Sequence, residues 1–146
     1  MSDLHQAESV AARLRELLLA ANTVAGERVD SDREAAYERD ESPALLIELV
    51  SDMSTPHGRG SEVNELTFVV ISLTRAEEWR SAVNTLRLQA HAAITRDAAL
   101  ASLLANLHRT RAEWRAASAD LPFGYCAQQY SGKYLSNTTA LGRSAN

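Results

Sequence analysis

The spacing of apolar residues changes in the middle of the chain, within Glu65–Ala93. Between Leu66 and Leu73, apolar residues fill both sets of alternating positions, which predicts an extended strand that is apolar on both faces. From Trp79 to Ile94 they recur every three or four residues, which is the spacing of one face of a helix. A strand that leads into an amphipathic helix predicts a sheet with a helix packed on it.

Similar patterns predict the other elements of the fold. We expect, in chain order, a helix over His5–Asn22, a short strand near Arg28–Ser31, strands over Ala44–Val50 and Val63–Thr74, helices over Ala76–Ile94 and Asp97–Leu107, and strands over Arg109–Ala117 and Tyr125–Leu135. Asp97 is the expected N-cap of the last helix. Runs of strands separated by a helical block favour the α+β class, with a mostly antiparallel sheet packed against two or three helices.

The length of 146 residues predicts a single compact domain, which we place at residues 1–135. Ser136–Asn146 has little to bury, so we expect it to be a flexible C-terminal tail.

A polar segment separates the two central strands. Ser51–Glu62 contains two glycines and a proline among polar residues, which predicts a hairpin loop longer than the usual two to five residues. Such a loop projects from the body of the domain. His57, Arg59 and Glu62 are therefore candidate contacts to another protein.

The strand over Arg109–Ala117 alternates between charged residues and others. Arg109, Arg111, Glu113 and Arg115 fall on one face, and the other face, which includes Trp114, is expected to pack on the core. The charged face could be simply solvated, could follow a phosphate backbone, or could meet an acidic patch on a protein. Such an acidic patch occurs in Glu27–Glu41, so we take Asp30, Asp32 and Arg33 as candidates for the opposite side of a contact between copies.

Three tyrosines lie in the last predicted strand. Tyr125, Tyr130 and Tyr134 could pack at the edge of the sheet or anchor another chain, because tyrosine is enriched at interfaces.

The composition excludes several kinds of function. The net charge of −4 disfavours nucleic acid as a partner. Cys126 is the single cysteine, so no internal disulfide or multi-cysteine zinc site is possible. Asp30 and Asp32 lack a third ligand at suitable spacing, and the four histidines are dispersed. We therefore expect no metal, no cofactor and no enzymatic activity.

No stretch is apolar over the roughly 18 residues that a transmembrane helix requires, and the N-terminus lacks the pattern of a signal peptide. We therefore expect no membrane partner and synthesis in a cytoplasm.

The order of these segments resembles that of the tail terminator proteins of long-tailed bacteriophages, the family of the lambda minor tail protein U. The resemblance covers nearly the whole chain and rests on the following stretches: VAARLRELLLA, AGERVDSDRE, ESPALLIELVSD, ELTFVVISLTR running into a long helix, DAALASLL, the strand that carries Trp114, and the final tyrosine-rich strand.

This resemblance implies a structural protein of the virion with no catalytic residues. Six copies would form a ring that caps the tail tube at its head-proximal end, stops its polymerisation and presents the surface that joins the head. The partners that this resemblance implies are the tail tube protein, a head–tail connector protein and the tape-measure protein, with assembly in the host cytoplasm. The alternatives are a neck, connector or head-closure ring of the same virion, a small ligand-binding α+β domain, and a nucleic-acid-binding module.

Overall fold

The computed structural model describes residues 5–31, 42–117, 123–137 and 140–143. Its elements are α1 (Gln6–Ala20), β1 (Val29–Ser31), β2 (Ala44–Pro56), β3 (Ser61–Thr74), α2 (Trp79–Arg96), α3 (Ala98–Leu103), β4 (Ala105–Ala117), β5 (Phe123–Asn137) and β6 (Ala140–Arg143). The sheet has the order β1-β2-β3-β5-β4, with β6 paired to β5. Every pairing except the parallel β1–β2 pair is antiparallel, so the predicted α+β class is confirmed.

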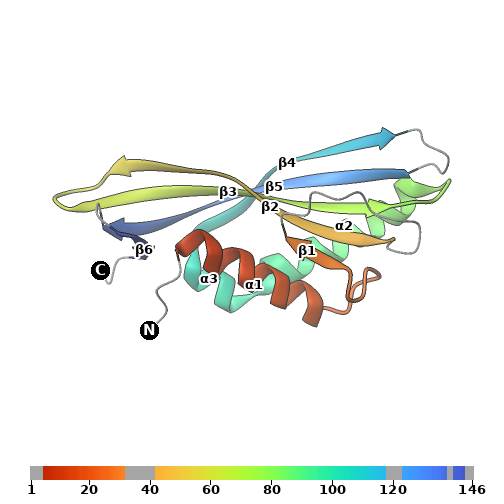
Figure 1. The fold of residues 1–146 in the computed structure, drawn as a ribbon, viewed down its shortest axis with the longest axis horizontal. Helices are drawn as coiled ribbons and strands as arrows, with labels where there is room; N and C mark the ends of the chain where they lie inside the picture. Colours follow the sequence, from red (N-terminus) through yellow and green to blue (C-terminus); the bar gives the residue numbers. More distant parts are fainter. Residues whose placement is uncertain (1–4, 32–41, 118–122, 138–139, 144–146) are drawn as a thin grey trace.

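All three helices cover one face of the sheet, which we call the helix face (Figure 1). Leu66, Phe68 and Val70 of β3 lie on this face and are fully or almost fully buried against the helices. The alternating residues of β3, such as Val69 and Ile71, lie on the opposite face, which we call the outer face, and are half-buried. The two apolar faces predicted for this strand therefore have different surroundings.

The two long helices bury the stripes that their sequences predict. The buried residues of α1 include Val10, Leu14, Leu17 and Leu18, and those of α2 are Val83, Leu86, Ala90 and Ile94. Both sets belong to helical spacing, so burying them removes a continuous apolar stripe from water. The predicted helix starting at Ala76 begins instead at Trp79.

Asp97 is the N-cap of α3, as predicted: its side chain accepts a hydrogen bond from the Leu100 backbone N–H at 2.8 Å. This short helix ends at Leu103, before the expected end at Leu107. Residues after Leu103 already enter β4, and Asn106 takes a positive φ of 55° beside an irregularity in the β4–β5 ladder.

The loop predicted over Ser51–Glu62 is wrong. β2 runs on to Pro56 and β3 starts at Ser61, so only His57–Gly60 forms the turn. Gly58 and Gly60 supply the positive φ angles that this turn requires. Polar side chains in this part of the sheet are hydrogen-bonded between neighbouring strands: Asn64 donates to Ser136 Oγ at 2.7 Å, and Ser54 donates to Asn64.

The resulting β2–β3 hairpin extends past the helices at one end of the molecule (Figure 1). The strand next to it, β5, continues beyond the expected end at Leu135 to Asn137, and Ser136 is fully buried. Ala140–Arg143 of the predicted tail pairs with β5 as β6. The proposed division at residue 135 and the flexibility of the tail stay predictions.

Candidate functional site

β4 is the outermost strand on one side of the sheet, and a β-bulge divides its arginines between the two faces. Arg109 pairs with Tyr130, whereas Arg111 pairs with Gln129, so Thr110 is an extra residue in the ladder. An extra residue reverses the direction of the side chains that follow it. Arg109 therefore lies on the helix face with Tyr130, and the prediction of one face carrying all three arginines is wrong.

The outer face of β4 carries Arg111, Glu113 and Arg115. Arg111 forms an ion pair with Glu113, and both side chains are substantially exposed, at 57% and 44%. An exposed pair of this kind contributes little to stability. It leaves Arg115 as an exposed cation at this edge.

On the helix face, Arg87 of α2 and Arg109 of β4 converge on one oxygen atom. We call these two residues the arginine pair. The Nη1 atoms of Arg87 and Arg109 donate to Gln128 Oε1, at 3.2 Å and 2.8 Å respectively. Gln128 is fully buried, and its Nε2 donates to the backbone carbonyl of Arg87 at 3.1 Å. The amide thus holds the two guanidinium groups next to each other.

Trp114 and Asn84 fix the position of Arg87. The Arg87 guanidinium lies over the Trp114 ring at 4.8 Å from its centroid, and its Nε donates to Asn84 Oδ1 at 3.0 Å. Trp114 Nε1 donates to the same oxygen at 3.0 Å. Trp114 is on the helix face as predicted, although 40% of it stays exposed because β4 is an edge strand.

His91 lies beside the arginine pair without adding charge to it. Its Nδ1 is 2.8 Å from the Tyr130 hydroxyl, and the two rings stack with centroids 5.8 Å apart. Burial lowers the pKa of His91 below its usual 6.5, and the positive charges of Arg109 and Arg87 lower it further. His91 is therefore neutral at pH 7, and the charge of this cluster is that of the two arginines.

The other side of the sheet also has a free edge, along β2. β1 pairs only with Leu45–Ile47 of β2, so no described strand pairs with the outer side of Glu48–Pro56, which we call the β2 edge. The β2 edge contains Glu48 and Asp52 and no lysine or arginine. Asp52 pairs with Leu66 and lies on the helix face, where its carboxylate accepts a hydrogen bond from the Tyr134 hydroxyl. Glu48 pairs with Val69 and lies on the outer face.

The structure separates the other predicted interface residues. Asp30 in β1 pairs with Leu46 on the outer face, at the opposite side of the sheet from the β4 arginines. Asp30 therefore does not contact the β4 arginines of its own chain. A contact between two copies requires this separation. Asp32 and Arg33 lie outside the described residues.

The three tyrosines lie in an interior strand, because β5 is between β3 and β4. Tyr130 is fully buried and stacks on Phe68 at 5.3 Å between centroids. Tyr134 is also buried, and Tyr125 is half-buried on the outer face. The side chains of Tyr130 and Tyr134 fill the core of the domain, and burial raises the pKa of both hydroxyls.

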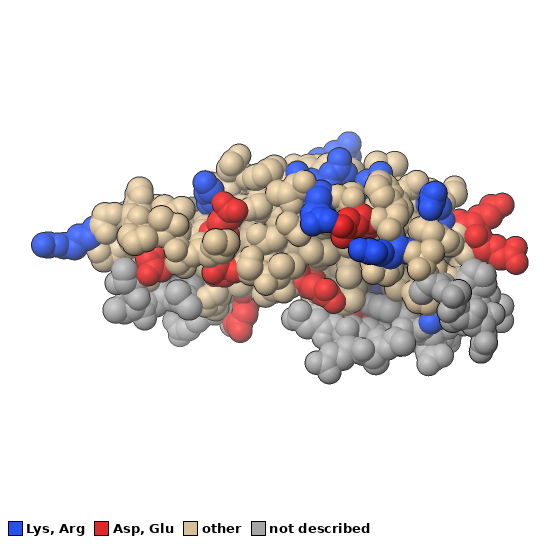
Figure 2. All heavy atoms as spheres, turned by 90° about the horizontal axis from the view of Figure 1, so that it is seen from above, with Lys and Arg blue, Asp and Glu red and all other residues tan. Residues whose placement is uncertain are grey.

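The hairpin places two of its candidate residues at an exposed tip. His57 and Arg59 lie in the turn and are exposed, and Glu62 follows in β3. The His57 backbone N–H donates to the Ser61 carbonyl at 3.0 Å, which closes the turn. A basic side chain stands at this end of the molecule in Figure 2.

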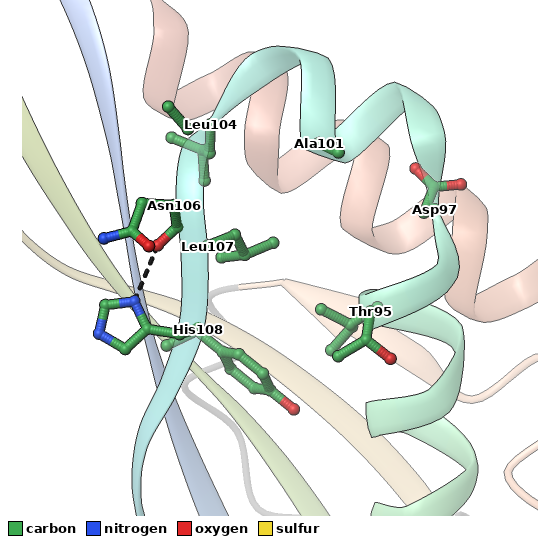
Figure 3. Close-up of a pocket in the computed structure, with 10 residues that line it drawn as sticks. Thr95, Asp97, Ala101, Leu104, Asn106, Leu107 and His108 are labelled. Atoms are coloured by element: carbon green, nitrogen blue, oxygen red, sulfur yellow. Dashed lines mark hydrogen bonds between the residues drawn. The ribbon is translucent and has the colours of Figure 1, made fainter.

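A hollow of about 220 Å³ lies between the ends of α2 and α3 and the start of β4 (Figure 3). Its lining is mixed, with apolar residues that include Ile94, Leu104 and Leu107 and polar residues that include Asp97 and His108. Asp97 is already bound to Arg13, with Arg13 Nε donating to Asp97 Oδ2 at 2.9 Å. His108 contacts the Asn106 carbonyl, at 2.8 Å, on the side of β4 away from Asp97. These groups do not converge as a nucleophile and its base would.

Among the described residues, no three side chains of His, Cys, Asp or Glu are grouped so that they could hold a metal ion. Cys126 is fully buried, and burial raises the pKa of its thiol. No helix in the described part of the chain is long and apolar enough to cross a membrane.

Comparison with known proteins gives little beyond this geometry. No protein-family model matches the chain, and no curated protein matches it. Among solved structures, a chain of the "Virion of native gene transfer agent (GTA) particle" is similar with a TM-score of 0.43 and 14% sequence identity. The match covers 86% of this chain and 93% of that one. A similarity at this TM-score carries no argument about function.

Sequence reasoning missed Arg87, Asn84 and Gln128. Arg87 stands in a helix far from β4 in sequence, and Gln128 looks like any polar residue of a strand. The sequence feature that pointed to this cluster was Trp114, because a tryptophan side chain on the helix face needs a neighbouring side chain to pack against.

Proposed function

We propose that this chain is a structural subunit of a phage-like particle and that its copies assemble into a closed ring. The observation that carries the proposal is that, among the described strands, the sheet has two edges without a pairing strand, which carry opposite charge on opposite sides of the molecule. β4 carries three arginines and one glutamate, and the β2 edge carries two acids and no cation. Figure 2 views the molecule from the β4 side and shows basic side chains, with an acidic one among them, gathered over the region of β4.

Two different surfaces that fit each other favour a ring rather than a symmetric dimer. A heterologous contact joins one patch of each copy to another patch of the next, and it generates a closed ring when the rotation between copies closes. The family resemblance of the sequence supports six copies. It also supports a position at the head-proximal end of the tail tube, where the ring ends tube polymerisation and joins the head.

The projecting hairpin supports contacts along the axis of such a ring. Its tip extends past the helices, so it can reach a neighbouring ring without disturbing contacts between subunits (Figure 1). We propose that His57 and Arg59 contact the tube protein or the connector protein. We propose a structural rather than an enzymatic role. This agrees with the hollow described above, where the polar groups do not converge as a nucleophile and its base would.

The test measures both the mass of the assembly and its effect on polymerisation of the tube protein. We expect native mass spectrometry and light scattering to show a hexamer, and we expect the hexamer to stop polymerisation of the tube protein of the same particle. A ring that binds the connector protein but leaves tube growth unchanged would indicate a neck ring instead. A monomer without effect on tube growth would overturn the proposal.

A further inference from the structure

The arginine pair has two positive charges and one neutral acceptor. Both guanidinium groups donate to Gln128 Oε1, and within the described part of the chain neither forms a salt bridge with a carboxylate. Two like charges that share a single amide oxygen repel each other. An anion that binds both groups would remove this repulsion.

The pair keeps donors available for such an anion. A guanidinium carries five N–H donors. Arg87 directs donors to Asn84 and Gln128, whereas Arg109 directs one to Gln128. Arg109 is exposed and Arg87 is half-buried. The site is therefore open to solvent, and its geometry is fixed by the buried Gln128 and by the Trp114 ring.

We propose that the arginine pair binds a carboxylate of the neighbouring copy in the ring, namely Asp52 on that copy's β2 edge. This inference rests on the proposed ring function. Arginine binds carboxylates through paired hydrogen bonds that are stronger than those between neutral groups. Asp52 and Arg109 both lie on the helix face, so their side chains are on the same side when the sheet of one copy continues into the next.

The strand directions support this contact. β2, β3, β5 and β4 are successively antiparallel, so β2 of a neighbour related by rotation about an axis along the strands meets β4 in the antiparallel direction. No described strand pairs with the outer side of β4 or with the β2 edge, and a strand edge of this kind is a template for pairing with another strand.

The rows across the sheet give the difference in level between Arg109 and Asp52 of the neighbouring copy. Arg109 pairs with Tyr130, Tyr130 with Phe68, and Phe68 with Leu49. Asp52 pairs with Leu66, two rows beyond the Phe68–Leu49 row because Val50 is an extra residue in β2, so Asp52 of a neighbour related by rotation alone lies about 7 Å along the strands from the level of Arg109. Part of this distance is covered by the length of the arginine side chain.

The experiment measures ring stability by native mass spectrometry at increasing dilution and salt. Arg109→Gln, Arg87→Gln and Asp52→Asn retain a hydrogen-bonding side chain but remove the charge. Each is expected to weaken association by about tenfold or more, as loss of a charge-assisted contact does. Arg96→Gln, at an exposed position in the last turn of α2, is the matched control and is expected to leave association unchanged.

A charge exchange separates loss of the contact from loss of the fold. Arg109→Asp and Asp52→Arg alone should each abolish rings, and the double variant should restore them. Wild-type-like rings from Arg109→Gln and Asp52→Asn would overturn this inference while leaving the ring function intact. A wild-type chain that forms no ring would instead defeat the proposed function.

Phosphate is the competing occupant of the arginine pair. Titration of the chain with inorganic phosphate, followed through the His91 ring signals by NMR, tests it. Phosphate binding that depends on Arg109, together with rings unaffected by Asp52→Asn, would assign the site to a phosphate ligand and overturn the carboxylate contact.

Discussion

Gly124 lets α2 begin directly on the sheet. A Cβ atom at this position would lie 2.2 Å from the ring of Trp79, the first residue of α2. The absence of a side chain allows the indole to pack on β5. The packing of the first residue of α2 on the sheet therefore depends on a glycine that is distant in sequence.

Gly124→Ala should destabilise the fold by about 1–3 kcal/mol, because the Trp79 ring must move to admit the methyl group. Urea unfolding measures the change. In the background of Trp79→Leu the same substitution should cost much less, since the smaller side chain leaves room. An equal loss of unfolding free energy in both backgrounds would show that the Trp79 indole is not the obstacle.

His91 should make the stability of the subunit depend on pH. Its pKa is lowered below 6.5 in the folded state, first by burial and then by Arg109 and Arg87. The unfolded chain therefore binds a proton more readily, so this part of the stability is full above pH 6.5 and declines as the pH falls below that value. Arg109→Gln should raise the pKa of His91 measured by NMR titration. An unchanged pKa would contradict the influence of Arg109.

At the scale of elements, Asp97 connects the three helices. It follows α2, caps α3 through the Leu100 N–H, and binds the Arg13 guanidinium of α1. The hydrogen bond from Arg13 is the main reason that the pKa of Asp97 is lowered below 3.8. The contribution of this carboxylate to stability is therefore present above pH 3.8 and is lost as the pH falls through its folded value.

Asp97→Ala should cost about 1 kcal/mol more than Asp97→Asn, because asparagine keeps the capping acceptor and alanine does not. Both variants lose the negative charge beside Arg13, so their difference reports the hydrogen-bond acceptor that asparagine keeps. Urea unfolding at pH 7 gives the two free energies. Equal values would show that the cap contributes nothing.

The β2–β3 hairpin has an exposed tip that can be changed without disturbing its ladder. We expect the double variant His57→Ala and Arg59→Ala to form rings as the wild type does, because both residues lie in the turn. It should bind tube or connector protein much more weakly in a co-sedimentation assay. Unchanged binding and unchanged capping would show that the hairpin is only a connection between strands.

At the scale of the whole molecule, the long sheet presents β4 at one side and β1 with β2 at the other. Within one subunit these edges are separated by the width of the sheet, so their opposite charges act only between copies. The helices cover one face and the hairpin extends past them (Figure 1). A molecule of this shape offers separate surfaces for the proposed ring contact and for the proposed contact of the hairpin.

Reversing the charge of the outer-face arginines should prevent assembly. Arg111→Glu together with Arg115→Glu makes the outer face of β4 acidic, so it should repel Glu48 and Asp30 of a neighbouring copy. Native mass spectrometry should then show monomers with an unchanged unfolding curve. Intact hexamers would exclude the outer face from the ring contact.

The sequence by itself determined the helices, most of the strands, the cap at Asp97 and the α+β class. These features follow from side-chain spacing over a few residues, which depends on local backbone geometry. The tertiary structure decided the face that Arg109 occupies, the length of the β2–β3 hairpin, the strand edges without a described partner, and the meeting of Arg87 with Gln128. Each of these depends on which distant segments pair and in what register. Thr110 shows the difference most plainly, because a single unpaired residue moves an arginine to the other face of the sheet.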